Sequence, residues 1–156
     1  MNRSFAFVLI CLSAAPALAD DVRLPARSDP VWQEECGSCH IAYPPSLLSA
    51  GDWRAVMQGL DRHYGVDAAL DEPTRARIAA FLEANAGRSR KGMDAPGLRI
   101  TQTRWFLHEH DEVPARVWSD PQVKGAANCG ACHRDAPQGR FDEHAIRMPV
   151  AGGRSR

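Results

Sequence analysis

Apolar residues recur at the spacing of an amphipathic helix through the first half of the chain, and turn-forming residues separate the apolar segments. The pattern predicts three helices, over residues 31–40, 52–63 and 72–86. Asp29-Pro30 is a favourable start for the first helix, because Asp caps free backbone N–H groups and Pro fits the first helical position. Asp52 is the expected cap of the second helix, and Gly65 and Gly87 are expected to end the second and the third.

The second half of the chain has weaker periodicity. Residues 98–105 fit either an extended segment or a helix, 114–119 fit a short helix, and the tail from Pro137 fits a loop. We find no strong alternation typical of strands, so the predicted fold class is mainly α with extensive loops. A polar segment with two glycines and a proline divides the chain into an N-terminal region, a linker and a C-terminal region: 20–87, 88–97 and 98–156.

Residues 1–19 have the pattern of a secretory signal peptide. Arg3 precedes an apolar run over 5–12, and a site of small residues at 17–19 follows. The run is shorter than the roughly 18 residues that span a bilayer, so we expect cleavage near Ala19/Asp20 rather than a retained anchor. This pattern predicts export to the periplasm.

All cysteines outside the signal peptide lie in two pentapeptides of one pattern. Cys11 is expected to be removed, and the other four of the five cysteines form Cys36-Gly37-Ser38-Cys39-His40 and Cys129-Gly130-Ala131-Cys132-His133. Small exported domains usually pair their cysteines as disulfides. Here no cysteine is left over for that purpose.

The spacing of a CxxCH motif suits covalent attachment of haem. Two thiols separated by two residues can add to the two vinyl groups of one porphyrin, and the following His reaches the iron as an axial ligand. A redox dithiol or a structural zinc site also uses paired CxxC, but both leave the adjacent histidines unexplained. We therefore predict a small c-type cytochrome organised around two covalently bound haem c groups. The predicted attachment residues and proximal ligands are Cys36, Cys39, Cys129, Cys132, His40 and His133.

Charge narrows the range of partners. The chain has 19 basic and 19 acidic residues, which gives no reason to expect a nucleic-acid or anionic-membrane partner. Two haems would add propionates and make the loaded protein more acidic than its sequence.

The sixth ligand of each iron decides the class of function, because an open position permits gas binding or catalysis and a closed one suits electron transfer. His63 follows His40 by 23 residues and is the best single candidate. His108 and His110 point to roughly opposite sides of a helix or strand, so only one of them should face a haem. His110 precedes His133 by 23 residues, which mirrors the first spacing.

Methionine is the rival type of axial ligand. Met93 lies in a loop after a helix, whereas Met57 is expected in a helix core, and His144 and Met148 are expected to have surface or packing roles. Three arginines are candidates for pairing with haem propionates: Arg54, Arg62 and Arg104.

The residues around both motifs are distinctive. They comprise the first motif with Ala-Tyr-Pro-Pro-Ser-Leu-Leu at 42–48, Trp53, Leu-Asp-Arg-His-Tyr-Gly at 60–65 with Asp67, Trp105-Phe106, His110, and the second motif with 146–149. This combination resembles the dihaem cytochrome c family of bacteria and covers nearly the whole chain after the signal peptide.

The resemblance implies two bis-histidine, low-spin haems in a soluble periplasmic electron carrier, with His63 and His110 as distal ligands. It also implies two partners, a small oxygen-binding cytochrome c and a membrane b-type cytochrome that supplies electrons. His108 is an additional histidine beside the matched one. A chain this small could also cross-ligate its haems, so the assignment of each distal histidine to a haem stays open.

The leading hypothesis is a one-electron carrier and not an enzyme, since enough histidines exist to close both irons. Imidazole at both axial positions should make both haems comparatively reducing. The alternatives are an enzyme with a five-coordinate haem, such as a dihaem peroxidase or a small-molecule reductase, and a gas or redox sensor. An enzyme of that kind usually needs more chain, and a sensor needs an output domain that we do not find.

Overall fold

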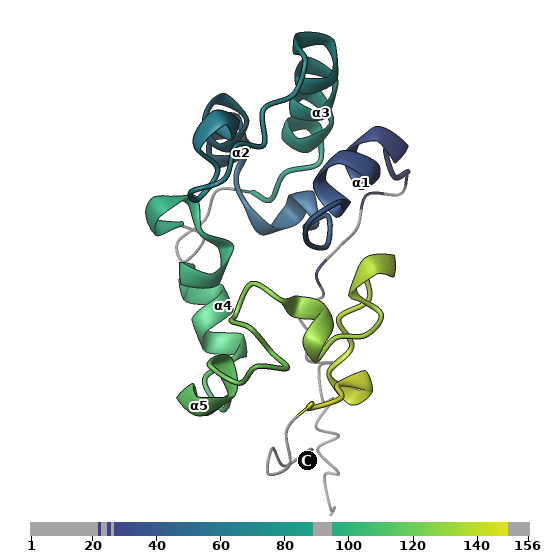
Figure 1. Ribbon diagram of the computed structural model, residues 1–156. Coiled ribbons are helices and arrows are strands. Elements are labelled where there is room, and N and C mark those ends of the chain that lie inside the picture. Colours follow the sequence, from purple (N-terminus) through teal and green to yellow (C-terminus); the bar gives the residue numbers. More distant parts are fainter. Residues whose placement is uncertain (1–21, 23–24, 26, 89–94, 150–156) are drawn as a thin grey trace, which may run out of the picture.

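The computed structural model describes residues 22, 25, 27–88 and 95–149, so the predicted signal peptide and most of the predicted linker lie outside the described residues. Its α-helices are α1 (Pro30–Gly37), α2 (Ala50–Gln58), α3 (Glu72–Ala84), α4 (Arg104–Glu109) and α5 (Ala115–Trp118). Short 3-10 turns join them, and within the described ranges β-pairing is limited to isolated bridges. The predicted mainly helical fold is confirmed. Figure 1 shows α1 to α3 gathered at one end of the molecule and α4, α5 and the C-terminal turns at the other.

Asp29 fixes the start of α1 as predicted. Its carboxylate accepts hydrogen bonds from two backbone N–H groups of the first turn, at 2.8 and 3.2 Å, and Pro30 occupies the first helical position. The same carboxylate accepts a hydrogen bond from Nε of Arg77 at 3.0 Å, which ties α1 to α3 and lowers the pKa of Asp29. The helix ends at Gly37, before the predicted end, so His40 lies beyond it.

The prediction of one helix over 52–63 was wrong at both ends. Ser49, not Asp52, caps α2: the Ser49 hydroxyl accepts from the Asp52 N–H at 3.1 Å, and the Asp52 carboxylate accepts from the Ser49 N–H at 3.3 Å. This capping box satisfies two otherwise free N–H groups and starts the helix earlier. After Gln58 the chain tightens into a 3-10 turn, Leu60–Arg62, and His63 follows that turn.

The third helix starts as predicted and ends earlier. Asp71 caps α3, and the Asn85 side chain donates to a backbone carbonyl of the last turn at 2.8 Å, so the helix stops there. Gly87 is therefore not the terminator. Its N–H donates to the Leu48 carbonyl at 2.9 Å and it forms a parallel bridge with Ser49, which joins the end of α3 to the start of α2.

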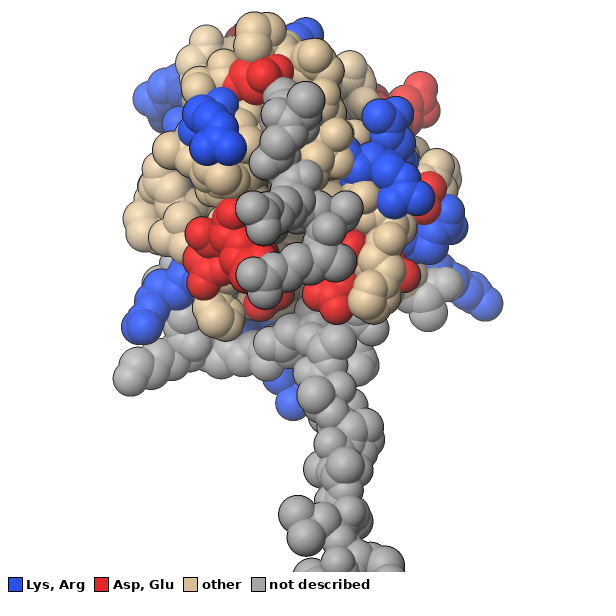
Figure 2. Space-filling view, turned by 90° about the horizontal axis from the view of Figure 1, so that it is seen from below, with Lys and Arg blue, Asp and Glu red and all other residues tan. Residues whose placement is uncertain are grey.

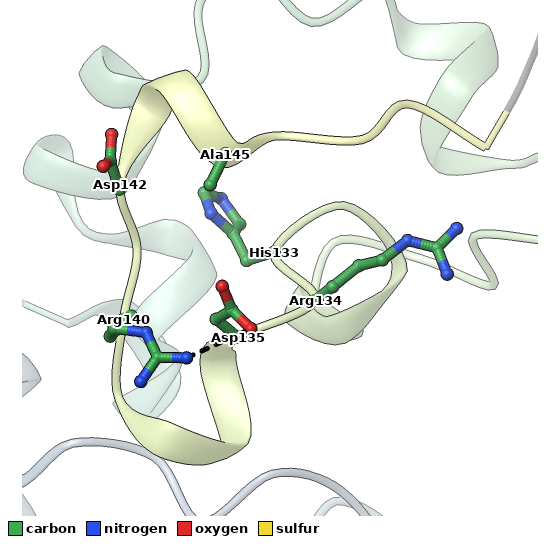
Figure 3. Close-up of a pocket in the computed structure, with 6 residues that line it drawn as sticks. All are labelled: His133, Arg134, Asp135, Arg140, Asp142 and Ala145. Atoms are coloured by element: carbon green, nitrogen blue, oxygen red, sulfur yellow. Dashed lines mark ion pairs between the residues drawn. The ribbon is translucent and has the colours of Figure 1, made fainter.

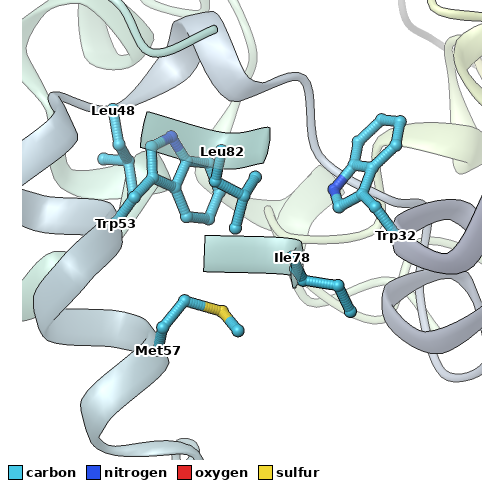
Figure 4. Packing of buried hydrophobic residues seen from close by; sticks show 6 residues of the cluster. All are labelled: Trp32, Leu48, Trp53, Met57, Ile78 and Leu82. Carbon is cyan, nitrogen blue, oxygen red and sulfur yellow. The ribbon is translucent and has the colours of Figure 1, made fainter. Parts of the chain in front are cut away.

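The main hydrophobic core lies in the N-terminal half, where α2 packs on α3 and α1 contacts α3. Its side chains converge from all three helices and the segment before α2, as Figure 4 shows. They are Trp32, Leu48, Trp53, Met57, Ile78 and Leu82. The one polar group of Trp53 is satisfied, since its indole N–H donates to the Pro45 carbonyl at 2.7 Å.

The C-terminal half buries fewer apolar side chains of its own. Its buried apolar residues among those described are Phe106, Val117, Val123 and Ala136. The fully buried hydroxyl of Thr103 caps α4 by accepting from the Phe106 N–H at 3.1 Å. The second CxxCH motif begins on a single 3-10 turn, Cys129–Ala131. A half with so little core of its own needs further apolar material to be stable.

The surface carries both signs of charge. In the view of Figure 2, acidic and basic side chains are both present and neither sign covers the face alone. Across the described ranges, none of the helices has the length and apolar character that crossing a bilayer requires.

Two neighbouring positions on α2 test this core. Met57 is 3% exposed and Gln58 is exposed. Met57→Ala should lower the free energy of unfolding by about 2–5 kcal/mol, because it leaves a cavity between α2 and α3. Gln58→Ala, on the same helix, should change it by no more than about 0.5 kcal/mol. Equilibrium urea unfolding measures both, and equal effects would contradict the packing described here.

Candidate functional site

The first CxxCH motif begins in the last turn of α1 and continues past its end. Cys36 is half-buried and Cys39 is exposed. Burial raises the pKa of the Cys36 thiol to about 11, with the neighbouring Glu35 carboxylate as a smaller cause. A reactive redox dithiol has the opposite property, a lowered thiol pKa, so the environment of Cys36 argues against that reading of the motif.

The cysteines of the second motif also have raised pKa values, although this motif begins on a 3-10 turn and not on an α-helix. Burial raises the pKa of Cys129 to about 11 and also raises the pKa of Cys132. The carbonyl of Cys132 accepts a hydrogen bond from the Arg147 N–H at 3.0 Å, which holds the tail against the motif. In the described part of the chain, none of the four cysteines forms a disulfide.

The rings of His40 and His63 face each other. Their ring centroids are 6.2 Å apart and the ring planes make an angle of 30°. His63 is placed by a tight turn in which Tyr64 and Gly65 have positive φ angles and His63 pairs with Val66. Burial, and next the nearby His40, lower the pKa of His63, which favours the neutral ring that binds metals.

His110 and His133 form a second pair. Their ring centroids are also 6.2 Å apart, at an interplanar angle of 77°. His110 follows α4, its ring stacks on Phe106 with centroids 4.1 Å apart, and Trp118 lies at 5.8 Å. Burial, and next the nearby His110, lower the pKa of His133.

His108 does not take part in this second pair. Its side chain is 82% exposed, and its nearest charged partner is Asp111, with Nδ1 and the carboxylate oxygen 4.0 Å apart. Of the two histidines that the sequence left open, His110 is the one that lies beside His133.

In each pair, one ring has its tautomer fixed by the backbone. Nδ1 of His40 lies 2.6 Å from the Ile41 carbonyl oxygen, and Nδ1 of His110 lies 2.9 Å from the Phe106 carbonyl oxygen. A carbonyl oxygen only accepts, so Nδ1 carries the proton in both rings and Nε2 keeps a free lone pair. Metal-binding histidines commonly have this arrangement.

The separation of the rings fits an iron held between two imidazoles. Metal–imidazole bonds of about 2.0 Å on either side of one ion place the two ring centroids about 6 Å apart. Both pairs have this spacing, at 6.2 Å, and each is adjacent to a CxxCH motif. Among the described residues, no group of three or more His, Cys, Asp or Glu side chains could hold a metal ion.

The family described as dihaem cytochrome c matches residues 32–141, which include both motifs and both histidine pairs. The chain belongs to the dihaem cytochrome c family. As a member, it is a dihaem cytochrome c that carries two c-type haems with iron. No curated protein sequence matches it.

Solved structures of dihaem cytochromes c are similar to this one. The new diheme cytochrome type c from Shewanella baltica OS155 has 37% sequence identity and a TM-score of 0.68, with 77% of this chain and 92% of that chain covered. DHC purified from Rhodobacter sphaeroides has 42% identity and a TM-score of 0.65, with 74% of this chain and 98% of that chain covered. These likenesses agree with the mainly helical fold described above.

Three large apolar side chains are exposed at positions close in sequence to the distal histidine candidates. The large apolar side chains that the described residues expose are Tyr64, Val66 and Leu107. Each lies within three residues of His63 or His110.

The other residues that the sequence analysis considered as axial ligands or propionate partners are not found in the histidine pairs. Met57 is in the core as expected, the His144 side chain is 85% exposed, and Met93 falls outside the described residues. Arg54 pairs with Glu83.

Sequence reasoning missed the pocket beside His133. It is lined by His133, Arg134, Asp135, Arg140, Asp142 and Ala145, as Figure 3 shows. Arg140 forms an ion pair with Asp135 at 3.3 Å. Arg134 and Arg140 line this pocket, and the sequence analysis did not single them out. The nearby ring of Phe141, 5.4 Å from that of His133, was also missed.

The two neighbouring histidines provide a direct test of this site. His110→Ala should leave one iron open, so that the reduced, haem-loaded protein binds about one carbon monoxide, because the imidazole that faces His133 is lost. His108→Ala should behave as the unaltered protein, since His108 faces solvent. Optical titration with carbon monoxide gives both results, and binding by the His108 variant alone would reverse the assignment.

Proposed function

We propose that this protein is a one-electron carrier in which both haem irons are closed by two histidines. His40 and His63 hold the first iron, and His133 and His110 hold the second. The observation that carries the proposal is the 6.2 Å centroid separation in each pair. Each pair is formed within one half of the chain, which favours this assignment over cross-ligation between the halves.

The chain itself keeps the proposed axial histidines in fixed orientations. Each bound haem supplies an iron that alternates between the ferric and ferrous states. The hydrogen bonds from Nδ1 of His40 and His110 to backbone carbonyls fix those rings in one orientation. The stacking of His110 on Phe106 adds a second constraint on that ring. Ligands that keep their positions in both oxidation states leave little reorganisation to oppose electron transfer.

An enzyme or a sensor would use one open iron instead. In a dihaem peroxidase or a reductase, the distal position has to admit a substrate, and a gas sensor has to admit its ligand. Both proximal histidines here face a second imidazole at a metal-binding distance. This arrangement supports a carrier over an enzyme or a sensor.

The proposed partners and location rest on the family resemblance and on the N-terminal sequence. We propose that the protein works in the periplasm, where it passes electrons from a membrane b-type cytochrome to a small oxygen-binding cytochrome c. The signal-peptide pattern of residues 1–19 supports export. Attachment of haem to CxxCH motifs in an exported chain is consistent with that location.

Spectroscopy of the haem-loaded protein tests the carrier proposal. We expect two low-spin ferric signals in the EPR spectrum, no absorption band typical of a methionine–iron bond, and no change in the optical spectrum of the reduced protein with carbon monoxide, because two imidazoles close each iron. The His110→Ala variant is the positive control for carbon monoxide binding. A high-spin signal or a carbon monoxide adduct in the unaltered protein would favour an enzyme or a sensor.

A further inference from the structure

Thr103 is a fully buried polar residue whose hydroxyl makes two hydrogen bonds. The hydroxyl donates to the Ile100 carbonyl at 2.8 Å and accepts from the Phe106 N–H at 3.1 Å. Burying a hydroxyl is costly unless it is paired, and here both its donor and its acceptor function are used. The side chain is therefore held between the turn Ile100–Gln102 and the first turn of α4.

Helix α4 depends on this contact more than a longer helix would. It has six residues, Arg104–Glu109, and helices shorter than about 12 residues are marginal on their own. The Phe106 N–H is one of the free donors of the first turn, and the Thr103 hydroxyl satisfies it. Without that hydroxyl a buried N–H would lose its partner, which is costly and favours a shift of the Phe106 backbone.

Phe106 transmits this constraint to His110 through two contacts. Its carbonyl oxygen accepts from Nδ1 of His110 at 2.9 Å, and its ring stacks on the His110 ring with centroids 4.1 Å apart and an interplanar angle of 18°. The Phe106 ring is itself buried, so its surroundings restrain it. The orientation of the His110 ring therefore follows the position of Phe106, which depends on Thr103.

On the basis of the axial role of His110 in the function proposed above, we propose that Thr103 is a positioning residue for the second haem site. Its hydroxyl fixes Phe106 at the start of α4, and Phe106 holds the His110 ring at the angle from which it binds the iron. Thr103 acts through Phe106 and is not itself a ligand. Loss of the hydroxyl should therefore change the orientation of the distal ligand without removing it.

Thr103→Val tests the proposal, because it removes the hydroxyl and nearly conserves the shape of the side chain. The EPR spectrum of a low-spin ferric iron depends on the orientation of its two imidazole rings. In the oxidised, haem-loaded variant, we expect the low-spin signal of the second haem to shift or broaden and that of the first haem to stay unchanged. Thr103→Ser keeps the hydroxyl and should retain both signals of the unaltered protein.

Two further variants control this test. His110→Ala identifies the second haem, because the low-spin signal that it abolishes belongs to that iron. Asp71→Ala removes a cap from another helix, since the Asp71 carboxylate accepts from the Thr74 N–H at 3.1 Å at the start of α3. This variant loses a cap in the N-terminal half and should leave both EPR signals unchanged.

An unchanged second signal in Thr103→Val would overturn the inference. Equal changes in both signals would do the same, as would a Thr103→Ser variant that behaves like Thr103→Val. A second measurement needs no variant: hydrogen exchange followed by NMR in the reduced, haem-loaded protein should show a slowly exchanging Phe106 amide proton, and exchange at the rate of an unprotected amide would also overturn the inference. Retention of both low-spin signals in His110→Ala would instead refute the proposed ligand assignment, so the two failures are distinguishable.

Discussion

An iron bound by two imidazoles requires the two rings to lie about 6 Å apart, and each half of this chain meets that requirement in a different way. His40 lies just past the end of α1 and His63 follows a 3-10 turn, whereas His110 follows α4 and His133 follows the turn Cys129–Ala131. The interplanar angles, 30° and 77°, differ widely while the separation is 6.2 Å in both. The distance is therefore the common feature of the two sites, and ring orientation is not.

The two halves of the chain differ in how much hydrophobic core their own side chains form, and bound haem would add to both. The N-terminal half packs two tryptophans and four aliphatic or thioether side chains between three helices. The C-terminal half has short helices and turns, with small or isolated buried residues such as Val117 and Ala136. Because a porphyrin is largely apolar, bound haem would add buried surface in each half, and the C-terminal half would gain more relative to its own core.

The sequence was most informative where the chemistry is local. The CxxCH pentapeptides and the Asp29-Pro30 helix start depend on neighbouring residues, so they could be read directly. Helix ends were harder to predict. Gly87 was expected to end the third helix, but it pairs with Ser49, and a contact between segments so distant in sequence cannot be read from local residues. Spacing and the family resemblance favoured His110 over His108, and the tertiary structure adds the packing of His110 against Phe106 and its proximity to His133.

The crystal structure of the oxidised, haem-loaded protein tests the central claim most directly. The account predicts one iron between His40 and His63 and a second between His110 and His133, with each haem attached through the two cysteines of its own motif. An iron with a methionine or water in place of either distal histidine would contradict it. So would an iron shared between His40 and His110, because the two halves would then not form separate sites.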